Sequence, residues 1–322
     1  AMALVSGMWG VATLVGPAIG GVFAELDAWR WAFWSLLPVV ALFAFLALAV
    51  LPRRSGDSND RTATPTTQLV LLTAAVLAVS AGSVSNVLAW NVAGIVAALI
   101  AAGALIVVEA KARHRLLPRG AFRLGAPLGA LYATMALLAV AVTSTEIFVP
   151  LFLQVLHAQT PLTAGYLAAL MAAGWTLGSI ASSGASEHGA RRAVQAAPII
   201  ALIGMAALTG LVPRPSDGAW NVLAPIAVAL AAVGFGVGLG WPHLLTRVLK
   251  VAPDDERDLA SASITTVQLF ATAIGAALAG MVANLGGLTD PGGVAGTSAA
   301  AFWLLAVFAL APFAALKTVA TR

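Results

Sequence analysis

Apolar stretches separated by short polar segments run along the whole chain. A helix needs about 20 predominantly apolar residues to cross the hydrocarbon core of a bilayer, which is about 30 Å thick. Ten stretches approach or exceed that length, at approximately 1–24, 31–51, 68–86, 88–108, 127–153, 162–184, 193–212, 219–241, 259–285 and 297–316. The pattern predicts an all-α integral membrane protein, a polytopic bundle of about ten transmembrane helices.

The apolar region between residues 68 and 108 is interrupted by a short polar turn, Ser83 to Asn86. Two helices explain this region better than one, because a single span would leave roughly 20 apolar residues in water.

The composition agrees with a membrane protein. Hydrophobic residues make up 60% of the 322 positions and charged residues 9%, and the mean hydropathy is +0.95. A soluble domain carries about 25% charged residues. The absence of cysteine excludes a disulfide framework, a thiolate metal site and a thiol nucleophile. The pI of about 10.1 suggests a nucleic-acid partner, but membrane topology explains the scattered basic residues better, so we expect none.

Basic residues gather on one side of the predicted membrane. When the start of the first helix is placed in the cytoplasm and the spans alternate, only Arg30 and Arg214 fall outside. The basic residues inside are Arg53, Arg54, Arg61, Lys111, Arg113, Arg115, Arg119, Arg123, Arg191, Arg192, Arg247, Lys250, Arg257, Lys317 and Arg322. The positive-inside rule therefore predicts a multi-pass protein of the inner (plasma) membrane with both termini of this chain in the cytoplasm.

Two hydrophilic segments divide the chain. Residues 52–67 are rich in Pro, Ser and Thr and predict a flexible cytoplasmic loop, whereas the basic loop 109–126 is expected at the lipid headgroups. These loops separate two helices in 1–51, a helical hairpin in 68–108 and six helices in 127–322.

The first apolar stretch contains SGMWGVATLVGPAIGG. In a helix, Ala12, Gly16, Gly20 and Ala24 would form a stripe of small residues that lets a neighbouring helix come close. Pro17 removes one amide donor and bends the helix beside two glycines. The stripe predicts a packing face, with or without a further role.

This stretch resembles the antiporter motif xxxGPxxGG on the fifth helix of major-facilitator drug:proton antiporters. The residues that carry the resemblance are Gly10, Gly16, Pro17, Gly20 and Gly21. The following WRWAFWSLLP is similar to the WRWxFxxNxP that opens the sixth helix in the fourteen-helix branch of that family, except that Leu36 stands where the family usually has Asn.

The resemblance implies a major-facilitator bundle without its first four helices. Residues 1–51 would then be the last two helices of the N-terminal half-bundle, 68–108 an inserted hairpin, and 127–322 the C-terminal half-bundle. Because the chain starts inside an apolar stretch, we expect it to be part of a longer protein.

The C-terminal block carries weaker matches. SEHGARR is similar to the family's G-x-x-x-D-R-x-G-R-R cytoplasmic loop, which implies a gating loop containing Glu187, Gly189, Arg191 and Arg192. A simple basic anchor on the cytoplasmic side explains the same residues. The alternating glycines of GFGVGLG (234–240) would let both faces of that helix approach neighbours, and no strand precedes them as a phosphate-binding loop would require.

Glu146 is the ionisable residue that lies well within a predicted span. A carboxyl group in that position can hold a proton and release it when water reaches it, which makes Glu146 the proton-coupling candidate. Alternatively, Glu146 lies in a wet outer vestibule or hydrogen-bonds to a neighbouring Ser or Thr. Glu109, next to Lys111 at a helix end, is expected to be an interfacial anchor.

Polar and aromatic residues within the spans are candidates for lining a substrate cavity. They are Thr143, Thr145, Gln154, Trp175, Trp241, Thr266 and Gln268. Aromatic faces attract cations, by about 2 kcal/mol when desolvated. Tryptophan at helix ends, including Trp241, more often forms an interfacial belt. The four histidines lack metal-ligand spacing and no Ser/His/Asp constellation is present, so we expect no metal site and no enzyme.

These features favour a secondary active transporter. The resemblance implies export of amphipathic or cationic small molecules in exchange for protons by alternating access of two half-bundles. The proton gradient would supply the energy without a cofactor, and we expect a monomer in the bilayer. The alternatives are a truncated, non-transporting remnant and a major-facilitator carrier of another solute; a membrane enzyme or channel would need a histidine cluster or a ring of like charges.

Overall fold

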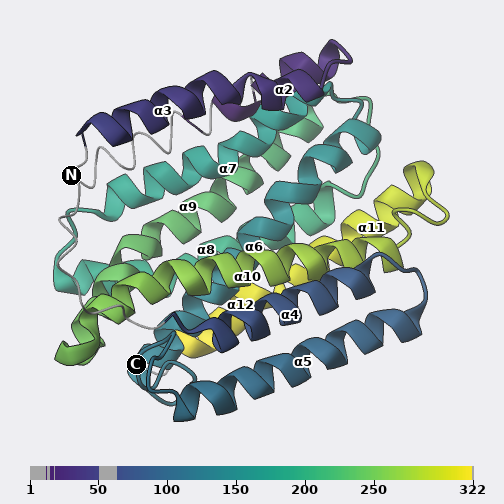
Figure 1. Cartoon of the computed structure of the whole chain (residues 1–322). Helices are drawn as coiled ribbons and strands as arrows, with labels where there is room; N and C mark the ends of the chain where they lie inside the picture. The colour runs from purple at the N-terminus through teal and green to yellow at the C-terminus, as the bar shows by residue number, and fades with distance from the viewer. Residues whose placement is uncertain (1–11, 13–14, 18, 51–63, 321–322) are drawn as a thin grey trace.

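The computed structural model describes residues 12, 15–17, 19–50 and 64–320, and the described part is helical without strands (Figure 1). Its helices are α2 (Arg30–Trp34), α3 (Leu36–Val50), α4 (Thr66–Ser83), α5 (Leu88–Lys111), α6 (Pro127–Leu156), α7 (Pro161–Ser182), α8 (Glu187–Leu211), α9 (Trp220–Val251), α10 (Arg257–Leu285), α11 (Gly293–Phe308) and α12 (Leu310–Ala320), with a 3-10 turn at Asp254–Glu256. Within the described ranges, nine helical stretches are long and apolar enough to cross a membrane. The polytopic all-α fold is therefore confirmed, while most of the first expected span, 1–24, lies outside the described residues.

Helices α6 to α12 share one hydrophobic core. α6 contacts α7, α9, α10, α11 and α12, and the core side chains run from Ala121 to Ala315. Three of the largest fully buried side chains in it are Met135, Phe152 and Leu230. This core fixes the orientation of α6, the helix that carries Glu146.

α9 packs between α7 and α8 through its alternating glycines. A Cβ at Gly234 or Gly238 would meet the backbone of α7 at Met171 and Trp175, and one at Gly236 would meet the backbone of α8 near Ala197. Backbone therefore lies against backbone on two sides of α9, which confirms the expectation that both faces of this glycine-rich helix permit close approach.

The α4–α5 hairpin packs through α4 against α10 (Figure 1). The buried Asn91 amide donates to the Gly82 carbonyl at 2.6 Å and to the Ser85 carbonyl at 2.8 Å, which closes the turn between the two helices. The Asn284 amide of α10 donates to the Ser83 carbonyl at 2.9 Å. The hairpin is thus fastened to α10 at its turn as well as along α4.

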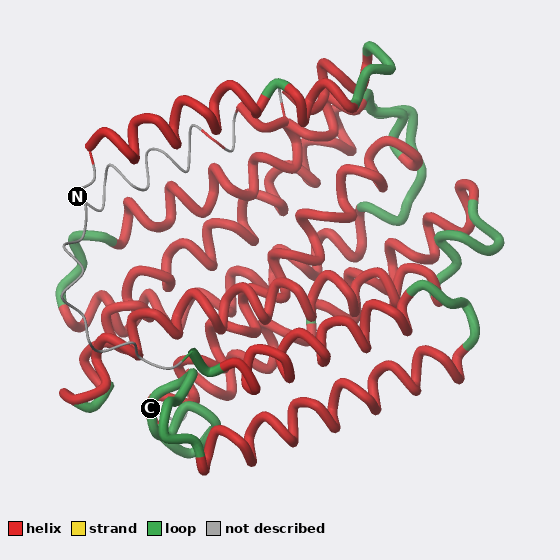
Figure 2. The backbone as a smooth tube through the Cα atoms, in the orientation of Figure 1, coloured by secondary structure: helices red, strands yellow, loops and turns green. Residues whose placement is uncertain are grey.

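Loops gather at the two ends of the bundle (Figure 2). At the end where α6, α8 and α10 begin, here called the basic end, Gln68 donates to the His114 carbonyl and Arg119 contacts Glu256. At the opposite end, His157 hydrogen-bonds to Ser216 between the α6–α7 and α8–α9 connections. The described spans therefore alternate in direction as the basic-residue distribution predicts. Which end faces the cytoplasm stays a prediction.

Several expected helix boundaries are wrong, and proline accounts for most of the differences. α9 continues through Pro242 to Val251 instead of ending near Trp241, since the surrounding helices support a helix with an internal proline. The last expected span is divided at Ala309, because Pro312 cannot donate to the carbonyl four residues earlier. The first span of the described region is divided at Ser35, three residues before Pro38, for the same reason.

Candidate functional site

α6 has one open face. In its second half, Glu146 and Ile147 are exposed, and Pro150 and Gln154 are half-buried one and two turns further on. Residues spaced by three or four lie on the same side of a helix, so Glu146 and Gln154 share this face. The Gln154 amide donates to the Pro150 carbonyl at 3.1 Å. The structure thus brings together the proton-coupling candidate and one of the cavity candidates.

A polar pair joins α6 to α10 near this face. The Thr143 hydroxyl is buried and lies 3.4 Å from the Thr272 hydroxyl. Gln268 is one turn before Thr272 and half-buried, so it lies on the same side of α10. Thr266 is two residues from Gln268, which places it on a different side of the helix, where its hydroxyl is 3.5 Å from the Ala262 carbonyl. Thr143 and Gln268 can therefore belong to one site, and Thr266 is separated from them.

Thr145 is not a cavity residue. Its side chain is fully buried between α6 and α8, where the hydroxyl donates to the Ala141 carbonyl at 3.0 Å and lies 3.2 Å from the Met205 sulfur. The expectation that Thr145 lines a cavity is wrong because only a tertiary contact decides which side of α6 faces its neighbours.

Trp175 of α7 and Trp241 of α9 form an aromatic pair. Their ring centroids are 5.1 Å apart with planes at 56°. Trp241 is only 9% exposed, so the interfacial-belt interpretation of this residue is wrong, whereas Trp175 is half-buried. Each lies about two-thirds of the way along a helix that ends at the basic end, while Glu146 lies about two-thirds of the way toward the opposite end. The aromatic pair and the carboxylate are therefore at different depths.

The antiporter-like stretch contacts α7. In this region the described residues 12, 15–17 and 19–25 are helical. A Cβ at Gly21 would lie 2.7 Å from Leu162, and a Cβ at Gly165 would lie 3.1 Å from Pro17. A Cβ at Gly16 or Gly20 would meet no described atom within 4 Å. The face in contact is thus one residue away from the expected stripe.

Gly10, the first residue of the antiporter-like motif, lies outside the described residues, so its place in this contact stays a prediction.

The expected gating loop is helical. Ser186 caps α8 by accepting a hydrogen bond from the Gly189 amide, and α8 begins at Glu187. Glu187 and Arg191 line a cleft of about 460 Å³ at the basic end, together with Arg247 and Lys250 of α9. The full lining, here called the basic cleft, is Leu131, Glu187, His188, Arg191, Arg247, Lys250 and Val251. Gly189 and Arg192 do not line it.

The loop between α5 and α6 is fastened by two carboxylates that sequence reasoning did not assign to this role. Glu109 is 4% exposed, and one of its oxygens accepts from the Leu116 and Leu117 amides at 2.6 and 2.7 Å. Glu256 accepts from the Arg119 amide at 2.7 Å and lies 3.0 Å from its guanidinium Nε. Glu109 does lie at the end of α5, as expected of an interfacial anchor, but it is buried and its carboxylate caps a turn of its own loop.

His157 lies just beyond the end of α6 and is fully buried. Its Nδ1 is 2.8 Å from the Ser216 hydroxyl and its Nε2 is 3.0 Å from the Val212 carbonyl. Desolvation by burial lowers the pKa of His157, although the bond to the Val212 carbonyl acts in the other direction. The neutral ring therefore joins two connections at the end opposite to the basic cleft. In the described part of the chain, no group of three or more His, Asp or Glu side chains could hold a metal ion.

Comparison with known proteins identifies the family. The family profile described as Major Facilitator Superfamily matches residues 1–276. A "probable multidrug-efflux transporter" of Mycobacterium tuberculosis is 39% identical over 292 residues, which is 88% of this chain and 61% of that protein. Multidrug resistance protein 3 of Bacillus subtilis is 22% identical over 286 residues, 85% of this chain and 53% of that protein.

A shorter match covers 33% of this chain and 21% of an aspyridones efflux protein of Neocamarosporium betae, at 38% identity. This chain thus spans 61% or less of the length of these relatives. The family is one of transporters rather than enzymes, and membership of the fourteen-helix branch stays a prediction. With its helical spans, its glycine-packed core and these matches, the chain belongs to the major facilitator superfamily.

Proposed function

We propose that the protein exports amphipathic or cationic small molecules in exchange for protons. The observation that carries this proposal is the 39% identity to the M. tuberculosis protein named as a probable multidrug-efflux transporter, which extends over 88% of this chain. The match includes the helices that carry Glu146 and the tryptophan pair, so the proposed chemistry lies within the matched length.

The aromatic pair is the proposed recognition element for a lipophilic cation. Trp175 is half-buried against Trp241, which holds its ring in place while leaving part of it accessible. A desolvated cation over an aromatic face gains about 2 kcal/mol, and apolar parts of the same substrate gain from the surrounding aliphatic side chains. The Gln268 amide and the Thr143–Thr272 pair add hydrogen-bonding groups deeper in the membrane.

Glu146 is the proposed proton carrier. It lies on the open face of α6, about ten residues from the end of that helix, which corresponds to about 15 Å along the helix axis. A carboxylate at that depth is costly to leave charged without water or a cation. Exchange of a proton for a cationic substrate would keep the site neutral, which is the coupling that antiport requires.

Alternating access would separate and rejoin the surfaces where the N-terminal segment contacts α7. The support for this step is the contact of Pro17 with Gly165 and of Gly21 with Leu162. In the proposed cycle, this contact closes one side of the pathway, and the charges of Glu187 and Arg191 contribute to closure at the basic end. The proton gradient supplies the energy, and no cofactor is needed.

The test is substrate-driven proton movement in inverted membrane vesicles that contain the protein. We expect ethidium addition to release protons in the wild type, and Glu146→Gln to reduce this release by at least about tenfold while binding is retained. Asp254→Asn is the matched control, because Asp254 is an exposed acid at the basic end, paired with Arg257. Unchanged coupling in Glu146→Gln would remove Glu146 from the mechanism, and absence of ethidium efflux in the wild type would remove the export proposal.

A further inference from the structure

The basic cleft has the composition of an anion site. Among the described residues that line it, three side chains are cationic, Arg191 of α8 and Arg247 and Lys250 of α9, and one, Glu187, is a carboxylate. His188 adds a titratable donor on the same side. An excess of cationic donors around a concave surface is the arrangement that recognises phosphate, because Arg and Lys donate charge-assisted hydrogen bonds to its oxygens.

Arg247 is the most enclosed of these cations. It is half-buried, whereas Arg191 and Lys250 are exposed, and it lies close enough to Arg191 and Glu187 for their charges to act on it. Two cations held near each other repel, and an anion placed between them offsets that repulsion. Among the described lining residues, Glu187 supplies one negative charge beside the three cationic side chains, and a bound anion would offset the repulsion among these cations.

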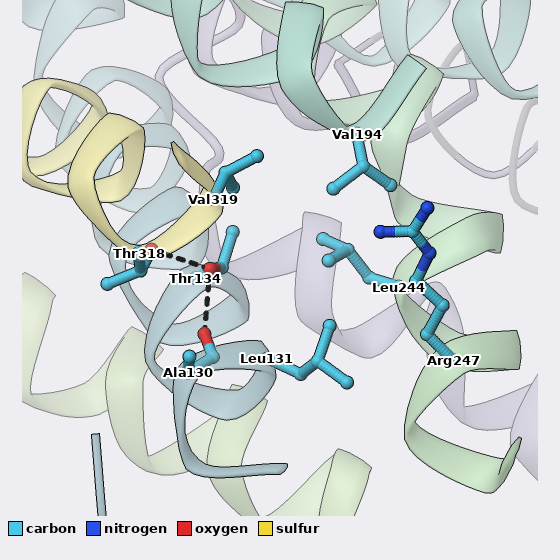
Figure 3. A pocket seen from close by; sticks show the side chains of 8 residues that line it. All are labelled: Ala130, Leu131, Thr134, Val194, Leu244, Arg247, Thr318 and Val319. Carbon is cyan, nitrogen blue, oxygen red and sulfur yellow. Dashed lines mark hydrogen bonds between the residues drawn. The ribbon is translucent and has the colours of Figure 1, made fainter. Parts of the chain in front are cut away.

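A smaller, mostly apolar pocket of about 20 Å³ shares part of its lining with the cleft (Figure 3). Arg247 and Leu131 line both, so the two cavities lie next to each other on either side of these residues. Figure 3 shows Thr134 and Thr318 on the side of this pocket opposite to Arg247, with the Thr134 hydroxyl 2.7 Å from that of Thr318. The lining of this pocket thus includes two hydroxyl groups and the Arg247 guanidinium among aliphatic side chains, and a pocket of this size has room for a water molecule.

The position of the cleft indicates whether a lipid or a soluble molecule would supply a bound phosphate group. Its walls are the second turn of α6, the first turn of α8 and the last turn of α9, so it opens where the helices leave the membrane. The apolar side chains of Leu131 and Val251 stand beside the charged ones. Basic pockets between transmembrane helices at this depth are suited to lipid headgroups, whose phosphate meets the cations while the glycerol and chains meet apolar side chains.

We propose that the basic cleft binds a phosphate group, with Arg191, Arg247 and Lys250 as its donors and an anionic phospholipid as its source. The site includes neither Glu146 nor the tryptophan pair, but it shares Glu187 and Arg191 with the closure proposed above for the basic end. Bound lipid would bridge α8 to α9 at the basic end and stabilise their packing.

The first experiment measures lipid retention. The purified chain in detergent is mixed with phosphatidylglycerol or with phosphatidylcholine, and bound lipid is counted by native mass spectrometry. We expect phosphatidylglycerol to be retained in preference, and Arg191→Ala and Arg247→Ala to weaken its binding roughly tenfold, as loss of a charge-assisted hydrogen bond predicts. Glu187→Gln should strengthen binding, because it removes a negative charge that lies beside the proposed donors.

Arg192→Ala is the matched control. Arg192 is exposed and adjacent to Arg191 but does not line the cleft. Arg192→Ala therefore removes the same surface charge as Arg191→Ala without removing a proposed phosphate donor. Arg247→Lys, which keeps the positive charge in place, tests whether a loss in Arg247→Ala reflects the missing donor or a disturbed fold. We expect partial retention of lipid in this variant.

The second experiment separates the two sources of phosphate. Thermal unfolding of the delipidated chain is followed with inorganic phosphate, and with chloride at equal ionic strength. Stabilisation by inorganic phosphate that depends on Arg191 and Arg247, with no lipid retention, supports the phosphate site and assigns it to a soluble anion. The proposal is overturned if neither probe distinguishes Arg191→Ala and Arg247→Ala from the wild type, or if Arg192→Ala loses as much binding as they do.

Discussion

The contact of Gly234 with the backbone of α7 predicts that Gly234→Ala destabilises the bundle. A Cβ at this position would lie 2.6 Å from the Met171 carbonyl carbon and 3.0 Å from the Trp175 amide nitrogen, whereas ordinary contacts are 3.4–4 Å. The Met171 carbonyl oxygen is closer still, and all three obstacles are backbone atoms that cannot rotate aside, so α7 would have to move away from α9 by at least about 1 Å. Overpacking of this kind costs about 1–3 kcal/mol.

The helix propensity of alanine works in the opposite direction and has to be removed from the comparison. Replacing glycine by alanine within a helix gains about 1 kcal/mol. Gly103, in the middle of α5, is the matched control, since a Cβ there meets no described atom within 4 Å. Both variants gain the same propensity, so the difference between them measures the steric cost alone.

The assay is reversible unfolding in mixed micelles by titration with sodium dodecyl sulfate, monitored by tryptophan fluorescence. We expect Gly103→Ala to be as stable as the wild type or more stable, and Gly234→Ala to be less stable than Gly103→Ala by about 1–3 kcal/mol. Equal stability of the two variants would refute the close approach of α9 to α7 on which the core description depends.

Two further predictions concern the loops. Glu109→Ala removes the acceptor of the Leu116 and Leu117 amides, so we expect these amides to exchange hydrogen at least about tenfold faster, and Glu109→Gln to have a smaller effect; unchanged exchange would contradict the capping role. Burial lowers the pKa of His157, so the unfolded chain binds a proton at this residue more readily than the folded chain does. The contribution of neutral His157 to the free energy of unfolding is therefore complete above the unfolded pKa of about 6.5 and should be lost as the pH falls through the lowered folded pKa. The free energy of unfolding, measured between about pH 7.5 and about pH 5, should fall with the pH in the wild type and fall less in His157→Gln. The control is His188→Gln, which changes an exposed histidine and should behave as the wild type does.

The sequence predicts the described spans well because bilayer thickness imposes a length on apolar helices that is visible without tertiary information. It also predicts the two-sided packing of α9, since alternating glycines have little other use within a membrane helix. It fails at Pro242, where the expected span 219–241 ends but α9 continues to Val251. Neighbouring helices satisfy the freed backbone groups in a bundle, so proline is a weaker boundary signal there than in water.

The candidate site is harder to predict because orientation about a helix axis depends on neighbours. Thr143 and Thr145 are two residues apart on α6, yet one contacts Thr272 of α10 and the other contacts Met205 of α8. The burial of Glu109 depends on a loop that folds back onto the end of α5, and no periodic pattern in the sequence predicts such a fold. Residue type therefore suggests the candidate residues, and the packed structure shows which of them face one site and which are buried between helices.

The glycine contacts of α9 also fix how the neighbouring helices can move. Where side chains separate two helices, a change of rotamer can let one slide past the other. Where main chain touches main chain, a displacement along the axis by one residue would push a methyl group of the next position into a carbonyl. α7, α8 and α9 therefore keep their relative positions along the helix axes. A large rearrangement of the described part of this protein is expected at helix contacts that are formed mainly by side chains rather than by peptide groups.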